Sequence, residues 1–182
     1  MTTASSLNIP TGDWKIDPVH STVGFTVRHM MVSKVKGTFT AFEGTIGVAE
    51  NIEDSKVAVS IDASSITTAN EQRDGHLRSA DFFNVENHAK ITFTSTSITA
   101  NNSDWFVQGD LSINGVTKPA QLAVEFGGVA AGQAGPTAGF EVATEITRSE
   151  FDITFNIPLE GGGVVIGDKI AIAIDVEANH IA

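Results

Sequence analysis

Three side chains that could do chemistry together, Arg73, Asp74 and His76, lie within one short stretch of the chain. They could offer a guanidinium, a carboxylate and an imidazole to a bound molecule. In one interpretation, Arg73 or His76 meets the polar headgroup of a ligand. We favour a second interpretation, an ion-paired cap on a turn, because Asp74 is adjacent to Arg73 and the protein is strongly acidic overall. The sequence has no G-x-S-x-G elbow and no H-E-x-x-H motif to indicate catalysis.

The other histidines do not have the spacing of metal ligands. His20 and His29 fall on opposite faces of one predicted strand, and His88 has no ligand spacing with His76. The chain has no cysteine, so thiolate chemistry and disulfides are excluded. Gly161-Gly162-Gly163 is not followed by the Lys-Ser/Thr pair of a phosphate-binding loop. The sequence therefore predicts no catalytic residue, no metal site and no cofactor.

The charge balance narrows the class of partner. The 182 residues include 22 acidic and 11 basic side chains, for a formal charge of −11. A basic footprint for nucleic acid is absent, and an anionic membrane surface would repel such a chain unless a local patch dominates. The sequence has no apolar run of membrane-spanning length, and its N-terminal residues lack the basic and apolar regions of a signal peptide. We therefore expect a cytoplasmic protein that neither binds nucleic acid nor inserts stably into a membrane.

Alternating apolar residues predict about eight β-strands. Short turns such as Asn114-Gly115 separate them, which favours antiparallel pairing. Within residues 35–48 the apolar side chains change parity near Ala41-Phe42, which predicts a bulge or bend. Closing the sheet removes its edges, so we expect an all-β, eight-stranded antiparallel barrel, with a β-sandwich as the competing architecture. The predicted strands span residues 20–29, 35–48, 57–61, 90–99, 105–113, 120–126, 140–146 and 170–176.

Two segments lie outside this strand pattern. Residues 1–12 are small and polar, and we expect a flexible N-terminal tail there, which leaves 13–182 as a single barrel domain. Residues 70–83 predict a short helical cover over one end of the barrel, because Asn70 can cap a helix N-terminus.

The inner faces of the strands could line a cavity. The chain has 11 Phe and no Tyr, and we predict that apolar side chains of shared parity face inward. A dry tunnel and an ordinary Phe-rich core are both compatible with this pattern, and periodicity alone favours the core. The residues predicted to face inward are Phe25, Val27, Phe39, Phe93 and Phe140.

No single short motif in the sequence is specific. The order and spacing of a series of such motifs identify the chain more closely. The series is Trp14-x-Ile16-Asp17-x-x-His20-Ser21, Phe25-x-Val27-x-His29, Gly37-x-Phe39, Ser65-Ile66-x-Thr68, Arg73-Asp74-x-His76-Leu77, Asp81-Phe82-Phe83, Gly109-x-Leu111-x-Ile113-x-Gly115-Val116-Thr117-Lys118-Pro119 and Ile146-x-Arg148-Ser149-x-Phe151. Together these motifs resemble the YceI-like family over about residues 13–178. The resemblance implies a lipocalin-like antiparallel β-barrel that binds a polyisoprenoid or another long-chain amphiphile. Many relatives are exported to the periplasm, and many carry Gly at the position of Asp152.

Three functions follow as hypotheses. The first is a binding protein that transports, stores or sequesters a polyisoprenoid lipid. The second is an enzyme that acts on an isoprenoid or another small apolar substrate in the same barrel, and the third is an interaction protein with a filled core. Such barrels can pair through exposed strand faces or edges, so a homodimer is a candidate assembly. The residues expected to contact the ligand are Phe25, Val27, His29, Phe39, Phe42, Arg73, His76, Phe82, Phe93, Phe140, Arg148 and Phe151.

Overall fold

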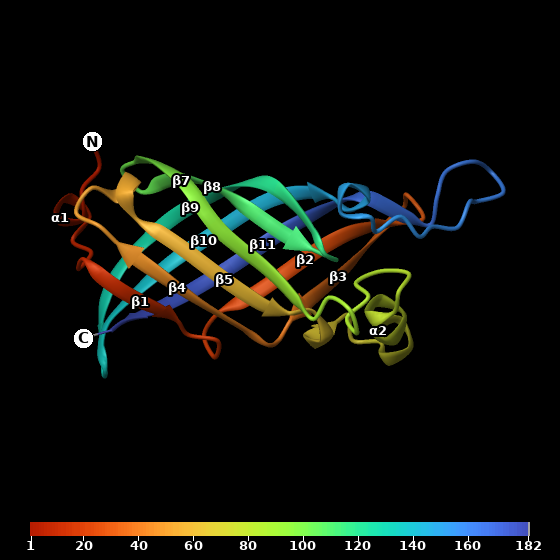
Figure 1. Ribbon diagram of the computed structural model, residues 1–182, viewed down its shortest axis with the longest axis horizontal. Helices are drawn as coiled ribbons and strands as arrows, with labels where there is room; N and C mark the ends of the chain where they lie inside the picture. The colour runs from red at the N-terminus through yellow and green to blue at the C-terminus, as the bar shows by residue number, and fades with distance from the viewer. Residues whose placement is uncertain (182) are drawn as a thin grey trace.

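The chain forms a closed antiparallel β-barrel with a short α-helix at each end, as Figure 1 shows. The computed structural model describes residues 1–181. The helices are α1 (Ala4–Leu7) and α2 (Glu71–Arg78), and three short 3-10 helices span Ile52–Asp54, Ala63–Ser65 and Arg148–Phe151. The strands are β1 (Gly12–Ile16), β2 (Thr22–His29), β3 (Ser33–Phe39), β4 (Phe42–Val48), β5 (Lys56–Asp62), β6 (Ile66–Thr67), β7 (Lys90–Asn101), β8 (Asp104–Ile113), β9 (Val116–Gly132), β10 (Gly135–Thr147) and β11 (Ile166–His180).

Eleven strand segments make eight barrel strands, because three of the strands are interrupted. β1 and β2 form one interrupted strand and β3 and β4 form the next, since β1 pairs with β4 while β2 pairs with β3. β5 and β6 form the third, since they pair with β4 and β3 respectively. β7 to β11 follow as antiparallel neighbours, and β11 pairs with both β2 and β1 to close the barrel. The eight-stranded antiparallel barrel predicted from the sequence is confirmed.

The interruptions lie side by side and bend the barrel wall. The Asp62 amide donates to the Ala41 carbonyl at 2.9 Å, and the Thr40 amide donates to the Ser65 carbonyl at 3.3 Å. The gap between β3 and β4 at Thr40-Ala41 is the bend that the change in parity predicts. Because of this bend, Phe39 before the gap and the even-numbered apolar residues of β4 after it face the same interior of the barrel.

Two strand glycines make room for aromatic rings on the inner face. A Cβ atom at Gly37 would overlap the ring of Phe25, and one at Gly109 would overlap the ring of Phe93. Phe25 is paired directly with Gly37, and Phe93 lies diagonally opposite Gly109 on the neighbouring strand. In both positions an aromatic side chain can cover a strand glycine. These glycines therefore set where the Phe rings lie inside the barrel.

The first twelve residues differ from the flexible tail that the sequence predicts. Thr3 caps α1 through a reciprocal capping box with Ser6. Ala4 and Ile9 are buried, and the Thr2 hydroxyl donates to the Ala100 carbonyl at 3.2 Å. Small residues that look mobile in sequence therefore pack against the end of the barrel that lies opposite α2 (Figure 1).

The β2–β3 hairpin turn is built from residues that turns do not favour. Met30 and Met31 have φ of 51° and 63°, in the left-handed region where Gly and Asn are preferred. A non-glycine residue there costs about 1–2 kcal/mol. By contrast, Asn114 and Gly115 supply the positive φ of the β8–β9 turn in the way their sequence predicts.

α2 begins at the predicted cap. The Asn70 side chain accepts a hydrogen bond from the Arg73 amide at 2.9 Å, and α2 ends at Arg78, before Phe82 and Phe83. Phe82 is buried and Phe83 packs against the core, so this segment closes the barrel end by docking its apolar residues. Within residues 1–181, no helix has both the length and the apolar character needed to cross a membrane.

Candidate functional site

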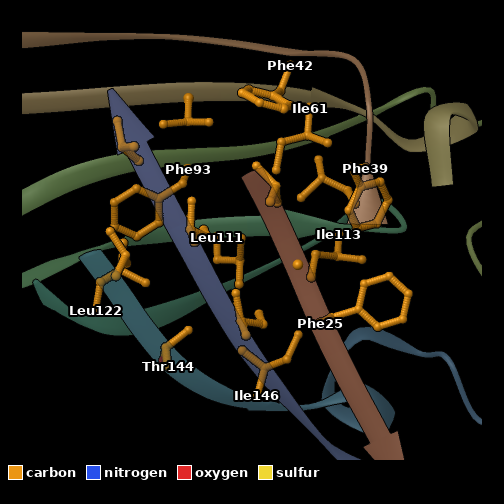
Figure 2. A pocket seen from close by; sticks show the side chains of 18 of the residues that line it. Phe25, Phe39, Phe42, Ile61, Phe93, Leu111, Ile113, Leu122, Thr144 and Ile146 are labelled. Carbon is orange, nitrogen blue, oxygen red and sulfur yellow. The ribbon is translucent and has the colours of Figure 1, made fainter. Parts of the chain in front are cut away.

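The barrel encloses an apolar cavity of about 260 Å³. One water molecule needs only about 10–15 Å³ of such space, so the interior is hollow enough for a much larger apolar molecule. Figure 2 shows the side chains of this wall facing one another from several strands, among them Phe25, Phe93, Leu111 and Ile146. The wall is almost wholly aliphatic or aromatic. Its polar side chains, within residues 1–181, are Ser21, Ser55, Thr144 and Arg148.

The structure places eight of the twelve predicted contact residues on this wall. Seven are apolar and one is charged, and all five side chains predicted to face inward are among them. The eight residues are Phe25, Val27, Phe39, Phe42, Phe82, Phe93, Phe140 and Arg148.

The other four predicted contacts do not lie on the wall, for different reasons. His29 ends β2 at the hairpin turn, and Phe151 is buried in the 3-10 helix Arg148–Phe151 without lining the cavity. Arg73 and His76 face other parts of the cover. Sequence reasoning also missed wall residues that share the alternation it used, and that alternation would have found them: Ile61, Leu111, Ile113, Leu122, Thr144 and Ile146.

Arg73 acts as a structural clamp between α2 and the segment before it. Its Nε donates to the Thr68 hydroxyl at 2.7 Å and its Nη2 donates to the Thr68 carbonyl at 2.9 Å. The same hydroxyl and the Thr68 amide donate to the carboxylate of Asp74, at 2.5 and 2.8 Å. Burial acts to raise the pKa of Asp74, but the hydrogen bonds from Thr68 and Thr67 and the charge of Arg78 together hold the pKa below its ordinary value. These contacts support a structural cap, but the described residues show no ion pair between Arg73 and Asp74, and Thr68 bridges the two side chains instead.

Arg73→Ala should therefore lower stability without changing ligand preference. Two charge-assisted hydrogen bonds are lost at a partly exposed site, so we expect the free energy of unfolding to fall by about 1–2 kcal/mol. Thermal unfolding measures the loss, and Arg28→Ala, at an exposed position of β2, is the matched control. A selective loss of affinity for phosphorylated lipids at unchanged stability would contradict the clamp.

His76 links the two segments that cover the mouth of the barrel. Its ring meets those of Phe82 and Phe155 edge-on, with centroids 5.0 and 4.9 Å away, and Phe82 and Phe155 are themselves 5.4 Å apart. Its Nε2 lies 2.8 Å from a carboxylate oxygen of Asp81. His76 thus joins the α2 segment to the loop of residues 152–165, and it does so outside the cavity.

Arg148 is the charged side chain on the cavity wall. It is only 6% exposed, and its guanidinium donates four hydrogen bonds, all to backbone carbonyls. These carbonyls belong to Ile153 and Phe155 at 2.9 Å each, Gly167 at 3.0 Å and Ile166 at 3.4 Å. Burial lowers the pKa of Arg148, partly offset by the nearby charge of Asp168, and the group remains a cation. Arg148 therefore fixes both ends of the 152–167 segment to the barrel.

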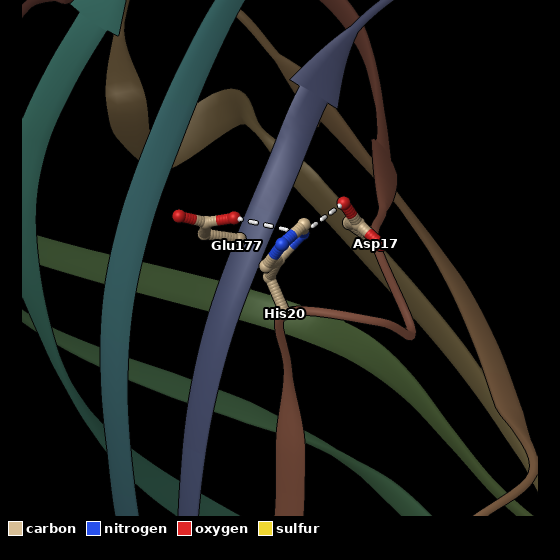
Figure 3. Close-up of side chains that lie close together, drawn as sticks. All are labelled: Asp17, His20 and Glu177. Carbon is tan, nitrogen blue, oxygen red and sulfur yellow. Dashed lines mark hydrogen bonds and ion pairs between the residues drawn. The ribbon is translucent and has the colours of Figure 1, made fainter. Parts of the chain in front are cut away.

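A second polar cluster lies outside the cavity, where β1 gives way to β2. His20 Nδ1 is 2.8 Å from a carboxylate oxygen of Asp17 and 3.5 Å from one of Glu177 (Figure 3). The hydrogen bond that His20 donates to Asp17, and then the charges of both carboxylates, raise the pKa of His20, and the same hydrogen bond lowers the pKa of Asp17. The three side chains could also share a cation, since their ligand atoms lie within 4.8 Å of one another. Sequence reasoning missed this cluster because the pairing of β11 brings in Glu177 from far along the chain.

The raised pKa of His20 makes the stability of the fold depend on pH, which can be tested. The fold stabilises protonated His20. The contribution of His20 to the free energy of unfolding is therefore present below the ordinary histidine pKa, and it is lost as pH rises through the raised pKa. We expect a titration of His20 followed by NMR to give a pKa above the ordinary value. Asp17→Asn should lower that pKa more than Glu177→Gln does, because Asp17 lies closer. An unchanged His20 pKa in Asp17→Asn would refute this assignment.

Comparisons with known proteins agree with this barrel fold. The family model for the YceI-like domain matches residues 14–178. A UPF0312 protein of Staphylococcus epidermidis is 40% identical over 169 residues, which is 90% of this chain and 95% of that protein. The YceI protein of Campylobacter jejuni has a solved structure that covers 91% of this chain and 96% of its own, with a TM-score of 0.71 and 34% identity.

A more distant structure shares the fold. It is a polyisoprenoid-binding domain from Saccharophagus degradans implicated in plant cell wall breakdown, with a TM-score of 0.66 and 17% identity over 92% of this chain and 98% of that one. The family model and the staphylococcal relative span nearly the whole barrel, including the strands that close it. The chain therefore belongs to the YceI-like family.

Proposed function

We propose that this protein binds a long-chain amphiphile, most simply a polyisoprenoid lipid, inside the barrel for transport, storage or sequestration. The observation that carries the proposal is the apolar cavity, whose wall presents one cation, Arg148, within residues 1–181. Similarity of fold to a polyisoprenoid-binding domain supports the same class of ligand.

Burial of the hydrocarbon supplies the affinity in this proposal. Each CH₂ group moved from water into the cavity contributes about 0.8 kcal/mol. Affinity should therefore rise with chain length until the cavity is full.

We further propose that Arg148 meets the polar end of the ligand. A guanidinium has five N–H groups, and the four hydrogen bonds to carbonyls leave one donor on Nη2. A phosphate or hydroxyl oxygen at this end of the cavity could accept it. The other predicted polar contacts, Arg73 and His76, are already bonded to Thr68 and Asp81.

The polar groups on the wall favour binding over catalysis. Within residues 1–181 the wall has no carboxylate or imidazole that could serve as a general base. The Ser21 hydroxyl donates to the Glu177 carbonyl at 3.2 Å, and the Ser55 hydroxyl accepts from the Ala49 amide at 3.0 Å. The wall hydroxyls of Ser21 and Ser55 are therefore already engaged with the backbone.

A chain-length series tests the proposal. Trp105 lies on the cavity wall and Trp14 does not, so Trp14→Phe leaves a single fluorophore beside the ligand. Prenols of increasing length added to the delipidated protein should change the Trp105 emission, with affinity that rises and then levels off. Native mass spectrometry of the gently purified protein should show bound lipid. Absence of binding at every length would overturn the proposal, and conversion of the lipid during incubation would favour the enzyme hypothesis.

A further inference from the structure

The tip of the β2–β3 hairpin exposes an apolar cluster to solvent. Met31 and Val32 are 62% and 81% exposed, and Met30 is also exposed. The left-handed conformation of Met30 and Met31 gives no steric reason for methionine at these positions, since Asn or Gly would be less strained. Large apolar side chains held at a strained turn indicate a role other than stability of the turn.

Three cations lie directly behind this tip, on the outer face of the same hairpin. Arg28 is paired in register with Lys34, and Lys36 follows two residues later on the same face. Like charges directly opposite one another on paired strands are destabilising. Within residues 1–181 none of the three makes a salt bridge, and residues 18–42 contain no acidic side chain although the chain carries −11 overall. The hairpin is therefore a local basic patch on an acidic protein.

The hairpin tip lies at the mouth of the barrel. The Met30 amide donates to the Val165 carbonyl at 2.7 Å, which joins the tip to the loop of residues 152–165. That loop exposes a further apolar side chain, Ile157, at 52%, and its acidic residues are Asp152 and Glu160. Figure 1 shows the tip, this loop and the α2 segment at the same end of the molecule.

We propose that the β2–β3 hairpin docks the mouth of the barrel onto a lipid bilayer that contains anionic phospholipid. Met30, Met31 and Val32 enter the boundary between headgroups and acyl chains, while Arg28, Lys34 and Lys36 lie at the level of the phosphates. The bilayer is the chosen occupant because apolar side chains at a tip with cations one or two residues behind match its depth profile, and because the opposed cations lack acidic partners. Docking in this orientation presents the cavity mouth to the membrane. The inference goes beyond ligand binding, and it rests on the chemistry of the hairpin alone.

Vesicle sedimentation with the full-length protein tests this inference. Vesicles of phosphatidylcholine alone and of phosphatidylcholine mixed with phosphatidylglycerol are compared without any isoprenoid. The result is therefore separate from the proposed cavity ligand. We expect association with the anionic vesicles that weakens as salt is raised. Arg28→Gln and Lys34→Gln should each weaken it about fivefold. Val32→Asn should weaken it about tenfold.

Matched variants keep the test specific to the tip. Val19 is 81% exposed like Val32, but it precedes β2, roughly 23 Å of strand away, so Val19→Asn should leave vesicle association unchanged. The double variant Met30→Asn, Met31→Gly relieves the strained turn, so it should stay folded and still lose vesicle association. Equal binding to neutral and anionic vesicles, or an equal loss in Val19→Asn, overturns the proposal. A change of oligomeric state in the tip variants without any vesicle association would assign the tip to self-association and also overturn it.

Discussion

Arg148→Met is expected to lower the free energy of unfolding by about 4 kcal/mol. The substitution removes a cation that is 6% exposed and leaves the carbonyls of Ile153, Phe155 and Gly167 without their donor. The Ile166 carbonyl keeps the hydrogen bond from the Asn156 side chain at 2.7 Å. Hydrogen bonds to charged groups are worth about 1.5–3 kcal/mol each, and part of the loss is recovered when water reaches the loop. For a chain of this length, a melting temperature lower by about 10 °C should follow.

Urea unfolding followed by tryptophan fluorescence measures this effect. Arg28→Met is the matched control, because Arg28 is exposed on β2 and makes no salt bridge among residues 1–181; its effect should lie within about 0.5 kcal/mol. Arg148→Lys keeps the charge but cannot bond four carbonyls. Its loss of unfolding free energy should therefore lie between those of Arg148→Met and Arg28→Met. Equal unfolding midpoints for the Arg148 and Arg28 variants would show that the buried guanidinium does not hold the loop.

Phe93→Arg is expected to abolish ligand uptake. Phe93 is buried on the cavity wall, where its ring covers Gly109. An unpaired guanidinium at this position would bring water into a dry site or turn out of the barrel, and either outcome removes the apolar surface that the ligand needs. Uptake of a fluorescent long-chain lipid by the purified variant measures the loss.

Two further variants separate uptake from folding. Phe106→Arg places the same charge on β8 at a site that is 50% exposed, so it should leave uptake and folding unchanged. Val142→Trp adds bulk to the cavity wall without a charge, and it should shorten the longest prenol that binds. Normal uptake by a folded Phe93→Arg protein would show that the ligand binds elsewhere.

The sequence predicted the barrel because each strand carries its own periodic signal. The alternation of apolar residues located the strands and the inward Phe side chains, and the change of parity near Ala41 located the bend between β3 and β4. These features depend on neighbours along the chain. A homodimer and a cytoplasmic location stay predictions from the sequence.

Features that depend on distant pairing were not predictable in the same way. Glu177 joins Asp17 and His20 only because β11 lies beside β1 and β2. The packing of α1 depends on contacts between Thr2 and Ala100, so a polar, small-residue segment gave no local signal of order. Arg73 and His76 were placed near a ligand because their chemistry suits a headgroup, whereas their partners are Thr68 and Asp81.

The pairing of Trp14 with His180 also sets a constraint on biosynthesis. β1 leaves the ribosome long before its partner β11, so the barrel cannot close until β11 and all the residues between the two strands have been made. At about 5–20 residues per second this interval is roughly 10–30 s. During that time the nascent sheet has open edges and an uncovered apolar face, both of which promote aggregation. A chaperone that binds the open sheet would protect the chain over this interval, so the yield of folded protein should respond to the supply of chaperone.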